Sequence, residues 1–340
     1  MMRTSHRLTL IAALTIPLIS IGMPAEHQQK TGFYGEIQLL TGGLKASGKD
    51  IVTPDNARIN STSTDELNRR DPSFNSGFIM PNVELGYLFN QGQNDVFWRS
   101  SSEPTSEFTN LSEIGFSHRF HTGTKVSLII SPAALGNGNT VWQDPFASGD
   151  KRNTTQAETN GMGFDIENLL YGSLSLSYRY NDTQINKERS GSSLNNLSQA
   201  QKKQLIRDNS QHDVAVEFIN MMSPQTYLIG GIRYTQQYGQ QNNMDANLPG
   251  GNLSLYHISD DREYYAQLTY RSSHYKNHHV IFDKRRKDED VNVTAGVRFH
   301  QLLGNKWIVD TLISGGENQS NINFYDKEYY LFALGVSREF

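Results

Sequence analysis

The chain has 340 residues, no cysteine and a formal net charge of −4. The mild acidity argues against a nucleic-acid partner, which would require basic side chains gathered on one face. Without cysteine, the chain has no disulfide, zinc–thiolate site or lipidated cysteine. The mean hydropathy of −0.57 is that of a polar protein, yet the chain contains 16 tyrosines, 16 phenylalanines and 3 tryptophans. This combination is typical of a membrane β-barrel, in which only every second strand residue faces lipid.

Residues 1–25 are predicted to be a cleaved signal peptide. Basic residues precede an apolar stretch from Leu8 to Met23, which is too short and too interrupted to span a bilayer. Small residues follow, and we expect cleavage after Ala25, with Gly22 as the second choice; a retained membrane helix is the alternative. Cleavage after Ala25 removes two arginines and no acidic residue, so the net charge changes from −4 to about −6 in the mature domain, residues 26–340.

Apolar and polar residues alternate with a period of two from Gly32 to the end of the chain. This period is typical of β-strands with one apolar face. In the first run, Phe33, Ile37 and Leu39 share one face, and Glu36 lies on the other. About fourteen such runs follow one another, which predicts an all-β transmembrane barrel of fourteen antiparallel strands. Twelve is the alternative, if the weak third and tenth runs, around residues 96 and 253, are not strands.

The connections between these runs alternate between short and long, as in outer-membrane barrels with tight periplasmic turns and longer extracellular loops. A soluble β-sandwich is the alternative, but it has no reason to keep its long loops at one end. The short connections are Gln91–Gln93, His121–Gly123, Leu170–Gly172, Met222–Pro224, Asp260–Asp261 and Leu303–Asn305. The long ones lie near residues 43–76, 101–107, 133–160, 181–210, 239–251, 276–288 and 316–326.

The last run of the chain ends in an aromatic residue and carries its apolar residues on one face. It resembles the terminal-strand signal that barrel-assembly machinery recognises, so we expect that machinery as a partner. Lipid and lipopolysaccharide of the cell outer membrane are the other expected surroundings. The residues assigned to the signal are Tyr330, Phe332, Leu334, Val336 and Phe340.

Charged residues occupy the faces that the alternation turns inward, because a charge facing lipid costs a few kcal/mol near the bilayer midplane. We predict that they line a hydrated pore that biases which solutes pass. The alternative is a set of cross-barrel salt bridges that fills the interior, although a barrel of this strand number encloses more space than side chains usually fill. These residues are Glu36, Glu84, Arg99, Glu113, Arg119, Arg179, Glu217, Arg233, Arg271, Arg298 and Asp310.

Two of the long connections contain apolar residues. The spacing of leucines behind a serine predicts an amphipathic helix over Ser192–Arg207, which either folds inward to narrow the channel or packs on the outer rim. The run Trp142–Phe146 either covers the pore mouth or anchors the rim.

Other polar clusters do not assemble a recognisable reactive site. The basic run Lys284–Lys287 is predicted to be a solvated loop tip, with lipopolysaccharide phosphates as the alternative ligand. His278 and His279 lack further ligands at metal-binding spacing. His118 and His121 near Ser117, and His212 beside Asp213, could belong to a hydrolase, but no partners lie at a supporting spacing. We therefore expect no catalytic, cofactor or metal site.

Several segments resemble a known family. They are Gly32–Gly35, Trp142–Pro145, Val280–Arg285 and Ser320–Asp326, and they are similar to segments of the DUF2860 family, secreted proteins of marine gamma-proteobacteria. The resemblance covers nearly the whole mature chain. It implies a porin-like outer-membrane barrel and supplies neither a substrate nor a catalytic residue.

The function expected from the sequence is passive or weakly selective diffusion of small hydrophilic solutes across the outer membrane. A non-conducting barrel that acts through its surface loops, in adhesion or as a structural protein, is the alternative. An outer-membrane hydrolase comes third. The mixed signs of the inward charges leave the ion preference open, and the sequence does not give the oligomeric state.

Overall fold

The computed structural model describes residues 31–52, 67–69, 73–102, 110–148, 151–241, 243–302, 304 and 306–340. The predicted signal peptide and its cleavage site lie outside these residues. Within them, no helix is long and apolar enough to cross a membrane.

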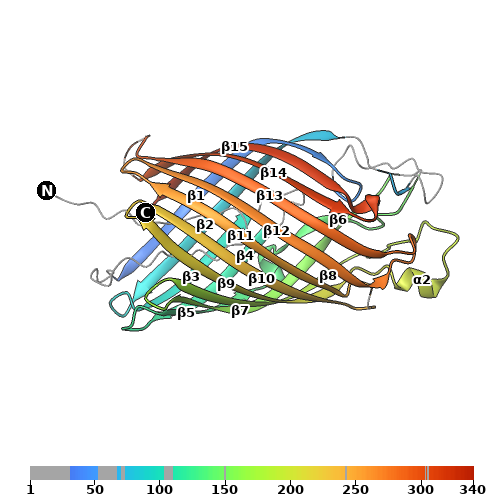
Figure 1. Cartoon of the computed structure of the whole chain (residues 1–340), viewed down its shortest axis with the longest axis horizontal. Helices are drawn as coiled ribbons and strands as arrows, with labels where there is room; N and C mark the ends of the chain where they lie inside the picture. Colours follow the sequence, from blue (N-terminus) through green and yellow to red (C-terminus); the bar gives the residue numbers. More distant parts are fainter. Residues whose placement is uncertain are drawn as a thin grey trace.

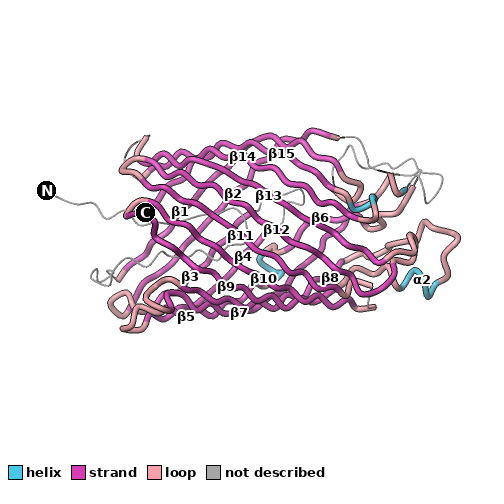
Figure 2. The backbone as a smooth tube through the Cα atoms, viewed as in Figure 1, coloured by secondary structure: helices cyan, strands magenta, loops and turns pink. Residues whose placement is uncertain are grey.

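The described chain is almost entirely β-strand (Figures 1 and 2). The α-helix α2 (Gln199–Lys203) and two 3-10 turns, η2 (Ala133–Leu135) and η3 (Asn323–Tyr325), lie in connections. The strands are β1 (Gly32–Ser47), β2 (Phe74–Phe89), β3 (Asn94–Ser102), β4 (Asn110–Arg119), β5 (Lys125–Ser131), β6 (Gly138–Trp142), β7 (Thr154–Leu169), β8 (Leu174–Ile185), β9 (Asn209–Ser223), β10 (Thr226–Gly239), β11 (Ala246–Ile258), β12 (Arg262–His278), β13 (Arg285–His300), β14 (Trp307–Ser320) and β15 (Lys327–Glu339).

These strands form one closed antiparallel barrel. Apart from β5 and β6, which do not pair with each other, each strand pairs with its neighbours in the chain, and β15 returns to pair with β1. Strands β5 and β6 both pair with β7, β5 along residues 161–167 and β6 along residues 154–158. They therefore occupy a single position in the wall, interrupted by η2 after Pro132. The barrel thus has fourteen strand positions, which confirms the predicted fourteen over the alternative twelve.

The apolar and polar residues that alternate in the sequence lie on opposite faces of the barrel wall. On β1, Phe33 is 83% exposed on the outer face, whereas Glu36 is 1% exposed on the inner one. The same division runs round the barrel and leaves an outer belt of exposed apolar side chains. Members of this belt are Ile37, Leu39, Ile79, Val96, Ile114, Leu128, Phe164, Val214, Phe218, Ile232, Leu253, Leu268, Val293, Ile313, Phe332 and Leu334.

The two rims differ in their connections. One, here called the short-turn rim, carries tight turns such as residues 90–93 and 259–261. The other, the long-loop rim, carries connections most of which are shorter than the sequence predicted. The connection expected at 239–251, for example, is reduced to 240–245, because β10 and β11 extend into it. Strand ends outside the apolar belt have polar residues on both faces, so hydrophobic alternation does not mark them.

The seam between the first and last strands closes at the short-turn rim. The register runs from Glu36 opposite Glu339 to Ser47 opposite Glu328. Beyond it, the backbone N–H of Phe340 donates to the carbonyl of Gly35 at 3.1 Å. A Cβ on Gly35 would collide with the backbone of β2 and with the Phe340 ring, so the seam requires glycine there. The five residues of the proposed assembly signal face outward and are exposed.

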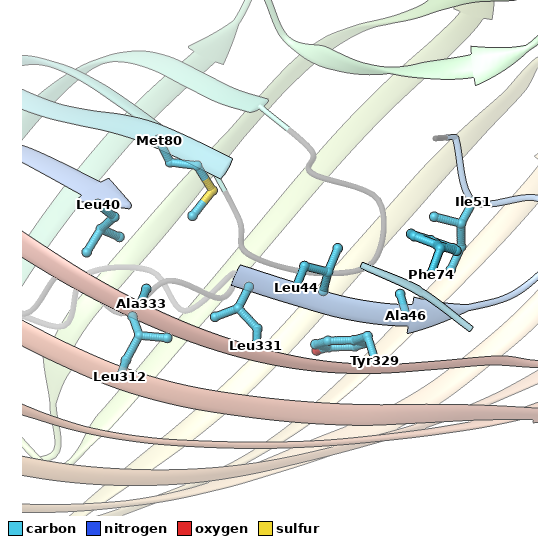
Figure 3. Packing of buried hydrophobic residues seen from close by; sticks show 10 residues of the cluster. All are labelled: Leu40, Leu44, Ala46, Ile51, Phe74, Met80, Leu312, Tyr329, Leu331 and Ala333. Atoms are coloured by element: carbon cyan, nitrogen blue, oxygen red, sulfur yellow. The ribbon is translucent and has the colours of Figure 1, made fainter. Parts of the chain in front are cut away.

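One side of the interior is apolar. Inward side chains of β1, β2, β14 and β15 form a buried cluster, here called the apolar wall (Figure 3). Its members are Leu40, Leu44, Ala46, Ile51, Phe74, Met80, Leu312, Tyr329, Leu331 and Ala333. These side chains are at most 7% exposed, so this side of the barrel is packed.

Candidate functional site

The eleven charged residues predicted to line a pore all lie on the inward register of their strands. Each alternates with an outward residue, as Arg298 does with Val297 and Phe299. The structure brings most of them into contact with a charge of opposite sign on another strand, and it does so in distinct groups. That they line a conducting pore stays a prediction.

The most buried group surrounds Arg298 on β13. Its guanidinium lies 2.6 Å from the Glu36 carboxylate on β1 and 2.9 Å from the Asp310 carboxylate on β14. Gln38 and Ser337 donate further hydrogen bonds to Asp310. All three charged side chains are at most 7% exposed. This group belongs to the packed side of the barrel and corresponds to the alternative reading, in which salt bridges fill the interior.

A second group joins β3, β4, β7 and β8. Arg99 lies 2.5 Å from Glu113, and Arg179 lies 3.7 Å from the same carboxylate. Arg179 also makes two hydrogen bonds to Asp165, at 2.6 and 2.9 Å. The sequence analysis did not single out Asp165, although it lies on the inward face of the same alternating run as Phe164 and Ile166 and could have been found from it.

A third, wetter group lies on β9, β10 and β12. The side chain of Arg233 is 30% exposed and lies 3.5 Å from Asp213, whose side chain is 15% exposed. Arg271 on β12 is exposed, although its register turns it inward beside Gly250 and Asp290. Together with the partly exposed Arg179, these residues form what we call the polar wall, on the inward face of β8–β12. Their exposure means that water reaches this part of the interior.

Between the polar wall and the short-turn rim, the inner face of the barrel is apolar. Inward residues of β9, β10 and β11 form a buried apolar cluster, with Tyr265 of β12 packed against it. The cluster consists of Ile219, Tyr227, Ile229 and Tyr256. The water-accessible space beside Arg233 therefore narrows toward this rim.

Three of the predicted residues lie outside these groups. Glu84 and Glu217 each keep one buried carboxylate oxygen without a hydrogen-bond partner among the described residues. Arg119 lies at a turn and donates to the carbonyl of Gly123 at 3.5 Å. These side chains face inward without joining a common site.

At the long-loop rim, side chains from five separate connections pack into one apolar cluster, here called the cap. Its centre is Phe146, whose ring lies 4.9 Å from the Phe324 ring and 6.4 Å from the Phe282 ring, measured between centroids. The buried members are Leu67, Phe146, Leu205, Ile322 and Phe324, with Leu194, Leu197, Val280, Ile281, Phe282 and Tyr325 packed against them. Since these connections leave the barrel at different points of its wall, the cap joins opposite sides of the mouth. Of the two readings of Trp142–Phe146, the structure supports the covered mouth.

The predicted helix over Ser192–Arg207 is wrong. Only Gln199–Lys203 is helical, and its cap is Ser198 rather than Ser192. The residues before it form turns held by Asp144, which accepts hydrogen bonds from the backbone N–H groups of Gly191 and Ser193. The leucine spacing that suggested a helix is explained by the cap, because Leu194, Leu197 and Leu205 all pack into it.

The side chains of the basic run 284–287 do not all point the same way, because residues 285–287 belong to β13, where successive side chains alternate between the two faces. Lys284, Arg285 and Lys287 are exposed, as predicted for a loop tip. Arg286 instead turns inward, lies 2.6 Å from Asp288 and stacks over the Tyr325 ring at 3.5 Å. This guanidinium belongs to the cap region, and the phosphate contact proposed for the run stays a prediction.

His279, which was considered as a metal ligand, is hydrogen-bonded to neighbouring residues through both ring nitrogens. Nε2 of His279 lies 2.8 Å from the Tyr325 hydroxyl, and its Nδ1 accepts from the Ile281 N–H. Burial, with the nearby Arg286 guanidinium, lowers the pKa of His279 to about 3, so the ring is neutral at pH 7. Within the described chain, no group of three or more His, Asp or Glu side chains could hold a metal ion.

The hydrolase ingredients are separated by the strands that carry them. Ser117 is buried on the inward face of β4, while the adjacent His118 points outward, bonded to Asn94 and edge-on to Phe120. His212 likewise faces outward against Tyr178, whereas Asp213 turns inward to Arg233. Successive strand residues point to opposite faces, so neither pair can act on one substrate.

Comparison with known proteins places the chain in a family. The family model described as a protein of unknown function, DUF2860, matches residues 32–337. None of the curated proteins matches the chain.

Several solved structures resemble the barrel at low identity. OmpT, an outer membrane protein of Vibrio cholerae, is 10% identical with a TM-score of 0.45, covering 93% of this chain and 100% of that one. The CymD monoaromatic hydrocarbon channel is 6% identical with a TM-score of 0.47, covering 92% and 90%. The outer membrane channel DcaP of Acinetobacter baumannii is 8% identical with a TM-score of 0.44, covering 94% and 99%. Similarity at this level carries nothing about activity.

Proposed function

This chain belongs to the DUF2860 family, and from the barrel that the family model covers we propose an outer-membrane channel for small hydrophilic solutes. The outer belt supports the location. A continuous band of exposed apolar side chains around a closed barrel, with charges turned inward, matches the requirements of a lipid bilayer. Export by the predicted signal peptide, periplasmic short turns and extracellular long loops belong to the same proposal.

The polar wall is the observation that carries the channel function. Charged side chains at Asp213, Arg233 and Arg271 are reached by water inside a barrel whose opposite side is packed. A hydrated, charge-lined space lowers the free energy of a polar solute or ion within the membrane. Solutes would follow β8–β12, and the cluster around Tyr256 would form the constriction at the periplasmic side.

Single-channel recording of the refolded mature chain in a planar bilayer tests this proposal. We expect small stepwise conductances, and Arg271→Glu should shift the reversal potential in a salt gradient toward cation preference. Arg285→Glu is the matched control, since it makes the same charge change at an exposed, outward position on β13. Absence of conductance from a barrel that is shown to be folded would overturn the channel proposal.

A non-conducting barrel that acts through its loops is the second candidate, because one specific observation favours it. The cap joins five connections across the mouth, and the cluster around Ile229 packs apolar side chains on the inner wall toward the other end. In that case the long-loop surface would be the functional part. The recording described above separates the two candidates.

A further inference from the structure

Basic side chains gather on one part of the outer face, at the long-loop end of β12 and β13. They are Lys276 on β12, Lys284 in the turn that follows, and Arg285 and Lys287 on β13, and all four are exposed. None of them has a carboxylate partner among the described residues, whereas the inward-turned Arg286 is paired. This part of the surface, here called the basic surface, therefore carries positive charge that the barrel itself does not neutralise.

The pairing of the two strands holds these cations close together. His274 lies opposite Lys287 in the register, and His278 lies opposite Arg285. Side chains opposite each other on antiparallel strands have Cβ atoms about 5 Å apart. Lys276 lies on β12 between the two histidines, and the alternation of the strand places it on their face. One anionic group of modest size can therefore contact Lys276, Arg285 and Lys287 together.

The basic surface lies just beyond the apolar belt. Tyr270 on β12 and Val291 on β13 are the last exposed belt residues toward the long-loop rim on these strands. Lys287 is four positions from Val291, about 13 Å along the strand, which is about 10 Å in height for a strand tilted by about 40°. The headgroup layer above the hydrocarbon is about 5–8 Å thick. Long basic side chains can bend back by a few Å, so the cations reach the level of the lipid phosphates.

An aromatic ring stands beside the basic surface. The ammonium of Lys276 lies 5.5 Å from the centroid of the Tyr238 ring, which is exposed on the outer face of β10. Tyrosine is typical of the boundary between hydrocarbon and headgroups. The position of this ring agrees with the height inferred from the belt.

The acidic residues near the basic surface are engaged elsewhere or lie to one side. The Glu289 carboxylate accepts a hydrogen bond from the Tyr270 hydroxyl at 2.6 Å, and Asp283 lies 3.4 Å from His278. On the next strand, β14, the outward charge is Glu317. The positive charge is thus confined to β12 and β13, where it forms a local site.

We propose that Lys276, Arg285 and Lys287, with Lys284, bind the phosphate groups of lipopolysaccharide in the outer leaflet. Guanidinium groups bind phosphate through paired hydrogen bonds, and ammonium groups bind it as point charges. A lipid is favoured over free phosphate, because the apolar belt directly below the cations would contact its acyl chains. The proposal rests on the proposed location of the barrel and of its long loops outside the cell, but not on conduction.

The test is an equilibrium titration of the full mature barrel, in uncharged detergent, with lipid A, the bisphosphorylated anchor of lipopolysaccharide. The same lipid without its phosphates is the comparison ligand. We expect lipid A to bind about 100-fold more tightly, because each basic residue near a lipid phosphate raises the affinity about fivefold. The difference should shrink as salt is added, since exposed charges are screened. Equal affinity for the two lipids would overturn the proposal.

A triple variant locates the site. Lys276→Gln, Arg285→Gln and Lys287→Gln together should weaken lipid A binding about 100-fold and leave binding of the dephosphorylated lipid unchanged. The three side chains are exposed, so the barrel should still fold, and circular dichroism checks this. Unchanged affinity for lipid A in the folded variant would mean that the basic surface is not the site.

The matched control removes the same charge from scattered positions toward the same rim. It combines Lys45→Gln, Lys151→Gln and Lys203→Gln, all at exposed side chains. It should change the affinity by about twofold or less, because charges beyond a Debye length are screened. An equal loss in the two triple variants would show that net charge attracts the lipid, and would overturn the proposal.

Two competitors test the identity of the ligand. Inorganic phosphate has the charge without acyl chains, and phosphatidylglycerol has acyl chains with a single charge. If either displaces lipid A at equal concentration, the assignment to lipopolysaccharide is wrong. Recordings in a bilayer of neutral phospholipid leave the basic surface empty, so Arg285→Glu still serves there as the control for the lumen. Phosphate-dependent binding without conductance would sink the channel alone, and conductance without such binding would sink this proposal alone.

Discussion

The two long sides of the lumen share a fold and a sequence pattern but differ in hydration. Along β13–β15, β1 and β2, the inward positions are packed, and Arg298 lies between two carboxylates with its side chain 5% exposed. Along β8–β12, Arg233 keeps a side chain 30% exposed. An inward charge can therefore be either a structural element or part of a wet surface. What decides is whether another strand supplies enough partners and enough apolar surface around it.

The largest difference between the two sides should appear in stability. Arg298→Leu leaves Glu36 and Asp310 buried without their cation, which should lower the free energy of unfolding by about 3–5 kcal/mol. Arg233→Leu breaks a partly hydrated pair and should cost about 1 kcal/mol or less. Urea unfolding of both variants in lipid vesicles, followed by the fluorescence of the native tryptophans, measures this. Equal losses at the two sites would remove the distinction.

The two sides of the lumen should also differ in how fast an introduced cysteine reacts with a water-soluble reagent. The chain has no cysteine, so a single introduced thiol reports on its own position. Arg271→Cys on the polar wall should react with a charged, water-soluble thiol reagent about 100-fold faster than Ser337→Cys, which replaces a fully buried side chain in the Arg298 group. Comparable rates would mean that water enters along both sides.

The pH dependence of the cap gives a smaller effect and tests whether the cap controls access to the polar wall. His279 has a pKa of about 3 in the folded cap, lowered first by burial and then by Arg286, against about 6.5 when exposed. The undocked loop therefore binds more protons, and cap stability, fully present above pH 6.5, is lost as the pH falls toward 3. At pH 5 the loss is about 2 kcal/mol.

This loosening should speed labelling of Arg271→Cys as the pH falls from 7 to 5. The rate is expressed relative to that of Lys203→Cys, an exposed site, to correct for thiol ionisation. Adding His279→Gln should remove most of the pH dependence. If the ratio does not change with pH, reagent reaches the polar wall by another route.

Much of the fold follows from local sequence. The period-two alternation predicted both faces of the wall, and the order of short and long connections predicted fourteen strands, including the weak runs that became β3 and β11. The sequence did not predict the ends of those strands that have polar, water-exposed residues on both faces. The interruption between β5 and β6 was also missed, since Asn137 and Gly138 there carry no apolar signal.

The site was less predictable, because its groups are assembled from distant parts of the chain. The inward register of Arg298 could be read locally, but its partner Glu36 lies 262 positions away. The cap shows the same limit: Phe146, Leu205 and Phe324 come from three polar connections, each with too few apolar residues to indicate a core. Read alone, the leucines of residues 194–205 suggested a helix. Only their contacts with the other loops explain their spacing.

The seam between β1 and β15 has a consequence for how the molecule is made. Leu39 pairs with Val336, so the ring cannot close until nearly the whole sequence has been delivered to the bilayer. Until then, the growing sheet has two open edges, each with unpaired backbone groups that attract other strands. Pairing of such distant segments is slow. An open edge can therefore pair with another chain before the ring closes, and the last strand completes the barrel.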